Sequence, residues 1–264
     1  MFQGGTNKIT LLMMLVSVVL LAGMESCNKD GGDGLPPVHA KGTLEKLFEQ
    51  PLEISEPSGL AFGPGDTTLL VVSDNTNKVY EINLNGEVLR TLDYTGNDLE
   101  GVAYNPYDNL VAVTEERKRQ LVILDYTEGK ERQRADIPTG GNTENKGLEG
   151  VSYNRNNRAY YLVNEDLPGE LILWSPSGGI ISATQLNFAA DYSGIFADAQ
   201  NGFIYIVSDE SQALFKCDYN AKVITEYPLP DTKFEGVAVD GNKNLVYLVN
   251  DKTGKYFIFK MKYP

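Results

Sequence analysis

Histidine is nearly absent from this sequence of 264 residues, which contains only His39. A serine or cysteine nucleophile of the triad type needs a histidine beside it, so that class of mechanism is excluded from the rest of the chain. Zinc sites built from several histidines are excluded for the same reason. Any chemistry must therefore use carboxylates, hydroxyls, amides or a hard metal ion.

Positive charge is also scarce, and nowhere does it gather into a patch. The chain has 23 Lys and Arg against 36 Asp and Glu, giving a formal net charge of −13. Binding to phosphate backbones needs concentrated positive charge, so nucleic acid is excluded as a partner. An acidic surface of this kind favours solubility and can attract cations.

Only two cysteines and one long apolar run are present. Lys8 precedes the run Ile9–Gly23, which is shorter than the roughly twenty residues of a membrane-spanning helix and predicts a secretory signal. Cys27 follows closely, and the pattern resembles a bacterial lipoprotein signal, in which the cysteine becomes the lipidated first residue; a plain cleaved signal is the alternative. Cys217 then has no disulfide partner and is expected to be a small apolar filler on a strand.

These features predict three segments along the chain. Residues 1–26 are the signal peptide, and residues 27–41, rich in Gly, Asp and Pro, form a flexible tether because they have too little apolar surface to order themselves. Residues 42–264 form the folded domain. We expect an exported monomer, anchored in the cell envelope at the outer membrane, whose lipid is its only contact with the membrane.

Internal repeats predict the fold. Five segments align on a Glu-Gly or Ser-Gly step, and the glycines of these steps are Gly59, Gly101, Gly150, Gly194 and Gly236. Successive glycines are between 42 and 49 residues apart, which fits the blade of a β-propeller. Each repeat carries four short apolar or alternating runs separated by Asn, Gly or Asp turns.

The fifth repeat stops after three such runs, and the segment Thr43–Ile54 can supply the missing fourth strand. This closure would leave no open sheet edge between the first and last blades. The prediction is an all-β propeller of five four-stranded blades, closed by the N-terminal strand. A sixth, degenerate blade is the alternative, although no residues can be identified for it, and the repeat argues against a sandwich of similar size.

Two sets of residues recur at one mouth of the predicted channel. The inner ring begins the first strand of each blade, and the outer ring ends the second strand. The inner ring consists of Ser58, Glu100, Glu149, Ser193 and Glu235. The outer ring consists of Asp74, Glu115, Glu165, Asp209 and Asp251.

Carboxylates held this close repel one another, so a compensating partner is expected. Bound Ca²⁺ is one possibility, because it accepts oxygen ligands in flexible geometry, and Mg²⁺ is a poorer fit without a phosphate. The alternative is that the acids accept hydrogen bonds from backbone amides in turns and lock the blades together. The outer ring favours this structural role, whereas for the three inner glutamates the two readings remain equally open.

Three basic residues stand next to these rings in the sequence. Lys146 and Lys233 come just before inner-ring glutamates, and Arg117 follows Glu115 on a loop. They could form salt bridges within the mouth or bind an anionic ligand, and the sequence does not separate the two.

The ordered motifs VSD, EERKRQLVILD, NKGLEGVSYN and FEGVAVD…LVND together resemble the SdiA-regulated family of bacterial propellers, over about Thr43 to Lys262. The resemblance implies a propeller in the cell envelope and says little about a substrate. The Glu-Gly step also resembles gluconolactonase and regucalcin-like propellers, where a glutamate at this position helps to hold a divalent cation. That resemblance makes Glu100, Glu149 and Glu235 the candidate cation ligands.

Two functions follow as hypotheses. The first is a binding or scaffolding module on the envelope that takes a small-molecule or protein ligand at its acidic mouth. The second is a metal-dependent hydrolase of a lactone, sugar ester or phosphate ester, in which Ca²⁺ polarises the substrate oxygen and an inner glutamate acts as base.

Overall fold

The computed structural model describes Met1 and residues 39–139, 146–165 and 168–263. Apart from Met1, the predicted signal segment lies outside these residues, and so does Cys27. In the described part of the chain no helix is both long and apolar enough to cross a bilayer.

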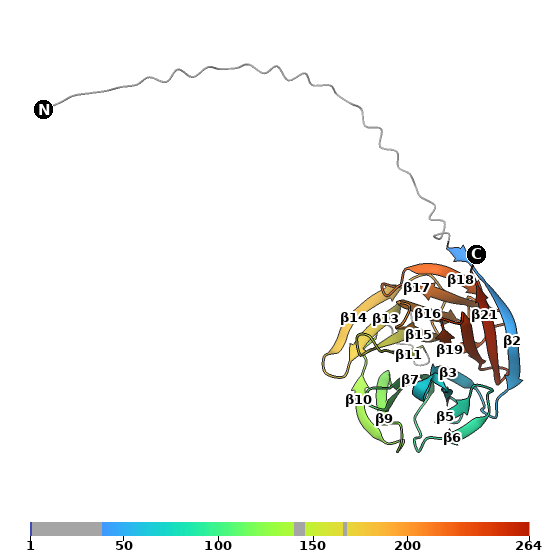
Figure 1. The fold of residues 1–264 in the computed structure, drawn as a ribbon. Coiled ribbons are helices and arrows are strands. Elements are labelled where there is room, and N and C mark those ends of the chain that lie inside the picture. The colour runs from blue at the N-terminus through green and yellow to red at the C-terminus, as the bar shows by residue number, and fades with distance from the viewer. Residues whose placement is uncertain (2–38, 140–145, 166–167, 264) are drawn as a thin grey trace, which may run out of the picture. The chain divides into compact units, whose positions relative to one another are not determined.

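Five antiparallel sheets are arranged in a ring, and each is a blade whose first strand faces the axis (Figure 1). The prediction of a five-bladed propeller is therefore confirmed. Blade 1 is β3 (Pro57–Phe62), β4 (Thr68–Ser73), β5 (Lys78–Asn83) and β6 (Val88–Thr91). Blade 2 is β7 (Leu99–Asn105), β8 (Leu110–Glu115), β9 (Gln120–Asp125) and β10 (Glu131–Asp136).

The remaining blades repeat this order, and one short 3-10 helix, η1 (Pro64–Asp66), follows β3. Blade 3 is β11 (Leu148–Asn154), β12 (Ala159–Asn164), β13 (Gly169–Ser175) and β14 (Gly179–Leu186). Blade 4 is β15 (Gly194–Asp198), β16 (Phe203–Ser208), β17 (Ala213–Cys217) and β18 (Val223–Pro228). Blade 5 is β19 (Phe234–Asp240), β20 (Leu245–Asn250), β21 (Lys255–Lys262) and β2 (Thr43–Pro51).

The N-terminal strand closes the last blade, as predicted. β2 pairs antiparallel with β21, with Thr43 opposite Lys262 at one end and Pro51 opposite Lys255 at the other. A two-residue strand, β1 (Ala40–Lys41), comes before it and pairs parallel with β18 on blade 4. The last two residues of the expected tether, Ala40 and Lys41, thus pair with a sheet edge.

The hydrophobic core is divided into five clusters, one between each pair of neighbouring blades. The second strands are apolar along almost their whole length because both of their faces are covered; all six residues of β12 are buried. The outermost strands face water, and β10 is mostly exposed and carries Glu131, Arg132 and Arg134. Cys217 lies in the cluster between blades 3 and 4 with no exposed surface, and burial raises the pKa of its thiol to about 12.

The repeated glycines permit the blades to meet at the axis. A Cβ added to any of the five would lie no farther than 2.7 Å from a backbone atom of the next blade. Gly59 faces the carbonyl of Glu100, and Gly236 faces Leu60 N, so the chain of contacts returns to its starting blade. Only glycine tolerates this approach, which explains why the step recurs in every repeat.

Candidate functional site

The inner-ring glutamates are presented by irregularities in the first strands. The strand pairing shifts between Leu99 and Val102 in β7, and at the matching place in β11 and β19. Each of these bulges contains one inner-ring glutamate: Glu100, Glu149 or Glu235. An extra residue in a strand redirects a side chain, and here the glutamates line a cavity at the axis.

This cavity has a volume of about 220 Å³ and is lined by ten carboxylates and one lysine; we call it the acidic mouth. Four of the five inner-ring residues line it, namely Glu100, Glu149, Ser193 and Glu235. The fifth, Ser58, is buried elsewhere and donates a hydrogen bond of 2.7 Å to the carbonyl of Leu99. Ser58 therefore links blade 1 to blade 2.

Four of the five outer-ring residues also line the acidic mouth, namely Asp74, Glu165, Asp209 and Asp251. Glu115 does not. Its carboxylate lies 2.8 Å from both Lys118 Nζ and Arg134 Nη1, and it accepts a hydrogen bond from Tyr94. Burial alone would raise the pKa of Glu115, but the hydrogen bonds from Arg134 and Lys118 hold that pKa below its usual value.

Glu116 takes the place in the acidic mouth that was predicted for Glu115. The β7–β8 register pairs Glu115 with Leu99, as Ser73 pairs with Pro57 in blade 1, so Glu116 corresponds to Asp74. The sequence contains the signal that identifies it. The lining acid stands fifteen positions after the inner glycine in all five repeats, whereas Glu115 stands fourteen after Gly101.

Sequence reasoning also missed two acids of blade 4, Asp191 and Glu210. Asp191 is buried and accepts hydrogen bonds from the hydroxyls of Ser193 and Ser208 and from Glu210 N. It stands three positions before its inner glycine, as Asp98 does in blade 2. An acid three positions before the inner glycine is therefore the sequence pattern that identifies Asp191.

The three predicted basic residues all pair with carboxylates of the protein. Lys233 Nζ lies 2.8 Å from Asp209 and 3.6 Å from Glu235. Lys146 Nζ lies 3.0 Å from Glu165 at the rim, and Arg117 Nε lies 2.9 Å from Asp98. In this structure they neutralise part of the mouth.

These lysine and arginine side chains compensate only some of the carboxyls in the acidic mouth. Burial, with Glu235 nearby, raises the pKa of Glu100 well above its usual value, and burial with Glu100 nearby does the same for Glu149. Burial and the charge of Asp251 raise the pKa of Asp74 to about 6. Burial, followed by a hydrogen bond with Asp98, raises the pKa of Glu116 to about 7. The acidic mouth therefore holds more carboxyls than its lysine and arginine neighbours can balance, and the excess must bind protons or a cation.

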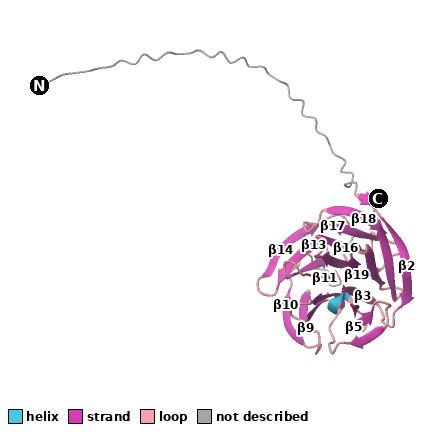
Figure 2. Ribbon diagram, viewed as in Figure 1, coloured by secondary structure: helices cyan, strands magenta, loops and turns pink. Residues whose placement is uncertain are grey.

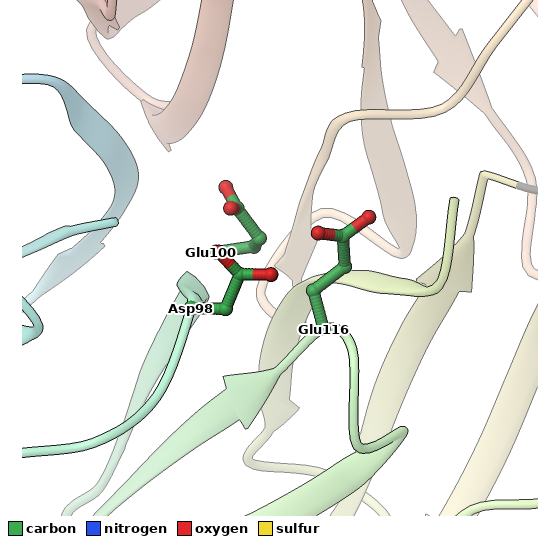
Figure 3. A group of neighbouring side chains, drawn as sticks. All are labelled: Asp98, Glu100 and Glu116. Carbon is green, nitrogen blue, oxygen red and sulfur yellow. The ribbon is translucent and has the colours of Figure 1, made fainter. Parts of the chain in front are cut away.

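Two groups of three carboxylates have the spacing of cation ligands. Asp98, Glu100 and Glu116 offer oxygens that all lie within 4.8 Å of one another, and so do Glu116, Glu149 and Glu165. Figure 3 shows the first group: Glu100 lies in β7, Asp98 on the loop just before that strand, and Glu116 on the turn after β8. Two oxygens on opposite sides of a Ca²⁺ ion are about 4.6–5.2 Å apart, so both groups match this ion. Glu116 belongs to both.

Fold and site together define a class: a five-bladed β-propeller with an acidic cavity at one end of its axis. The family described as SdiA-regulated matches residues 43–260. The chain belongs to this SdiA-regulated family, as its repeat motifs suggested.

Solved structures share the fold at low sequence identity. Glutaminyl cyclase from Myxococcus xanthus is 14% identical with a TM-score of 0.69, and the match covers 86% of this chain and 100% of that one. A catalytically inactive virginiamycin B lyase from Staphylococcus aureus, determined with quinupristin, is 17% identical with a TM-score of 0.51, covering 80% of this chain and 68% of the other. At these identities the likeness shows the fold alone.

Proposed function

We propose that this protein is a ligand-binding module of the cell envelope whose acidic mouth holds a divalent cation, with Ca²⁺ as the first candidate. In this proposal a lipid on Cys27 is its anchor, at the outer membrane. The observation that carries the proposal is the position of Glu116, which lines the acidic mouth and whose carboxylate is shared by the two ligand groups.

Unsatisfied oxygens support a cation at this place. Within the described residues, Oδ1 of Asp74 and Oδ1 of Asp251 are buried without a hydrogen-bond partner, and both aspartates line the acidic mouth. A buried oxygen without a donor costs free energy, and a bound ion removes that cost. Ca²⁺ takes six to eight oxygens in flexible geometry, which suits carboxylates that come from different blades.

The bound cation would give the module its ligand specificity. Lys233 and Lys146 neutralise some of the carboxylates, so the carboxyls that need protons or a cation are concentrated near Glu100, Glu116 and Glu149. An ion held there keeps coordination positions open toward solvent, because the cavity opens at the end of the channel. A ligand that supplies carboxylate, hydroxyl or carbonyl oxygens would complete its coordination.

The test is thermal unfolding of the purified protein in EDTA, and then with Ca²⁺ or Mg²⁺ added. An ion that binds only the folded state raises the melting temperature by mass action. A rise with Ca²⁺ supports the cation site. Unchanged melting with either ion would mean that the acids have a structural role, and the cation proposal would be abandoned.

A metal-dependent hydrolase is the second candidate, and the environment of Glu149 favours it. Its carboxyl is buried in the acidic mouth with a pKa well above the usual range, as is common for groups that transfer protons in catalysis. The propellers of similar fold include a cyclase and a lyase by name.

Glu149→Gln separates the two functions. If the protein is a hydrolase, the variant loses turnover of lactone or ester substrates while its fold stays intact, as judged by circular dichroism. Hydrolysis that survives unchanged would show that Glu149 is not the base. Glu128→Gln, at an exposed position on the β9–β10 turn, is the matched control and should behave as the native protein does.

A further inference from the structure

The channel has a second mouth, at the opposite end of the first strands from the acidic mouth. It contains a cavity of about 380 Å³ to which all five blades contribute. The helix η1 lies beside it, near β3 and the centre of the ring in Figure 2. The cavity has the size of a small-molecule site, and neither the acidic mouth nor the proposed cation uses it.

Five aromatic side chains, contributed by all five blades, stand in the walls of the second mouth. Phe62 of blade 1 makes edge-to-face contacts with Phe196 of blade 4 at 5.9 Å and with Tyr247 of blade 5 at 5.3 Å. Tyr104 and Tyr153 line the side formed by blades 2 and 3. Because these rings are fixed by packing against one another, they form rigid apolar surfaces for a flat or ring-shaped ligand.

Hydroxyl groups lie among these rings. Within the described residues, no hydrogen bond engages the hydroxyl of Tyr153 or of Tyr247, and both side chains line the cavity. The oxygen of Ser152 accepts a hydrogen bond from Ala197 N, which leaves the Ser152 proton available to a ligand. The cavity thus offers donors and acceptors at its wall without adding charge.

Most of the charged groups of the second mouth are paired, and only Asp198 has a neutral partner among the described residues. Asp66 on η1 forms an ion pair with Arg155 of blade 3, and Lys243 Nζ lies 2.9 Å from Asp240. Asp198 accepts hydrogen bonds from Asn201 N and from the Asn201 amide side chain. An ion would find little net charge to bind here, in contrast to the acidic mouth.

We propose that the second mouth binds a neutral, hydroxyl-rich ring, the size of one or two sugar units. The apolar C–H faces of such a ring pack against aromatic side chains, and its hydroxyls pair with tyrosine and serine hydroxyls. Paired carboxylates and guanidinium groups, as in Asp66 and Arg155, accept from and donate to sugar hydroxyls while they remain neutral as a pair. Aromatic walls, uncharged donors and balanced ions occur together in this cavity, and this combination assigns the ligand class.

The test is saturation-transfer NMR of the purified full-length chain with a panel of neutral sugars: glucose, galactose, mannose, N-acetylglucosamine, maltose and cellobiose. Indole is included as an aromatic probe without hydroxyls. At least one sugar should give a transfer signal, and titration calorimetry then measures its dissociation constant.

Tyr153→Phe combined with Tyr247→Phe removes both hydroxyls and keeps the rings. The loss of two hydrogen bonds should raise the dissociation constant for the sugar at least about tenfold. Arg155→Gln, at an exposed position, provides a second variant that does not disturb the core, and it should also weaken binding. Tyr80→Phe is the matched control, because the Tyr80 hydroxyl bonds Thr76 away from the cavity, and it should bind as the native protein does.

Three results would overturn the proposal. The first is a panel in which no sugar gives a signal, and the second is a sugar whose affinity stays the same in the double variant and in Arg155→Gln. In the third, indole binds and displaces the sugar signal at lower concentration than any sugar, which would make the cavity a site for aromatic compounds.

Discussion

At the scale of single residues, neighbours in the sequence can have opposite environments. Glu115 is enclosed by Lys118, Arg134 and Tyr94 on the side of blade 2, whereas the next residue, Glu116, faces the axis. Successive side chains of a strand point to opposite faces, so a shift of one position exchanges an ion-paired acid for one in the acidic mouth.

This pair of residues supplies the first prediction. Glu116→Gln removes the carboxylate common to both ligand groups, and should weaken Ca²⁺ binding at least about tenfold in titration calorimetry. Glu115→Gln should leave Ca²⁺ binding unchanged, because it lies outside the acidic mouth. It should instead lower the free energy of unfolding by about 2 kcal/mol, since Lys118 and Arg134 lose their partner. If Glu115→Gln weakened Ca²⁺ binding and Glu116→Gln did not, the strand register described above would be contradicted.

Much of the candidate site could be predicted from residues alone, because symmetry repeats it. The five-fold recurrence of an acid or serine before a glycine located Glu100, Glu149 and Glu235 without any coordinates. The pairing partners could not be obtained in this way. Lys233 reaches Asp209 of the preceding blade, and such a contact depends on how the blades pack.

At the scale of elements, the first strands determine the geometry of the axis. Their glycines bring five backbones into contact, and in three blades a bulge directly beside the glycine presents a glutamate. Alternating and apolar runs predicted the strands well, because burial on one or both faces produces those patterns. The bulges were not predicted, because an extra residue leaves no periodic signal in so short a strand.

A glycine substitution tests this close approach. In Gly194→Ala the new methyl group would collide with the carbonyl of Glu235 on blade 5, so the two blades must move apart. We expect a loss of about 3 kcal/mol in the free energy of unfolding, measured by chemical denaturation.

Gly202→Ala is the control for backbone strain alone. Gly202 has a φ of 77°, and no heavy atom lies within 4 Å of an added methyl group. Its cost should be about 1 kcal/mol. If Gly202→Ala destabilised the protein as much as Gly194→Ala, the contact between blades would not explain why glycine recurs at the axis in every repeat.

At the scale of the whole molecule, the acidic mouth makes stability depend on pH and on cations together. The pKa of Glu116 is raised to about 7 and that of Asp74 to about 6, whereas in the unfolded chain such groups titrate near pH 4. Between about pH 4 and about pH 7 the folded protein therefore binds more protons than the unfolded chain. Its free energy of unfolding therefore falls as the pH rises through that window.

In EDTA, the melting temperature should consequently be several degrees lower at about pH 8 than at about pH 5. Millimolar Ca²⁺ should restore it at the higher pH, because the ion replaces the lost protons, and should have little effect at the lower pH, where protons occupy the carboxyls. Differential scanning calorimetry measures both effects. A melting temperature that rises with pH in EDTA would contradict the raised pKa values.

Closure of the ring gives a prediction on the same scale. A chain that lacks all residues through Pro51 leaves β21 as an unpaired edge and removes the outer strand of blade 5. We expect it to aggregate and to lose cooperative unfolding. A chain that lacks residues only through His39 keeps β1 and β2, and should melt close to the full-length protein. Equal melting temperatures for the two truncations would show that β2 is dispensable.

The pairing of β2 with β21 also imposes an order in time. Of the strands in blade 5, β2 is made before blades 1 to 4, whereas β21 is the last strand along the chain, and each needs the other as its neighbour. While the intervening blades are synthesised, β2 remains unpaired because β21 does not yet exist. The final step of folding then joins residues separated by nearly the whole domain, which is slow because the entropy of closing so long a loop must be overcome first. The ring therefore cannot close until the chain is almost complete.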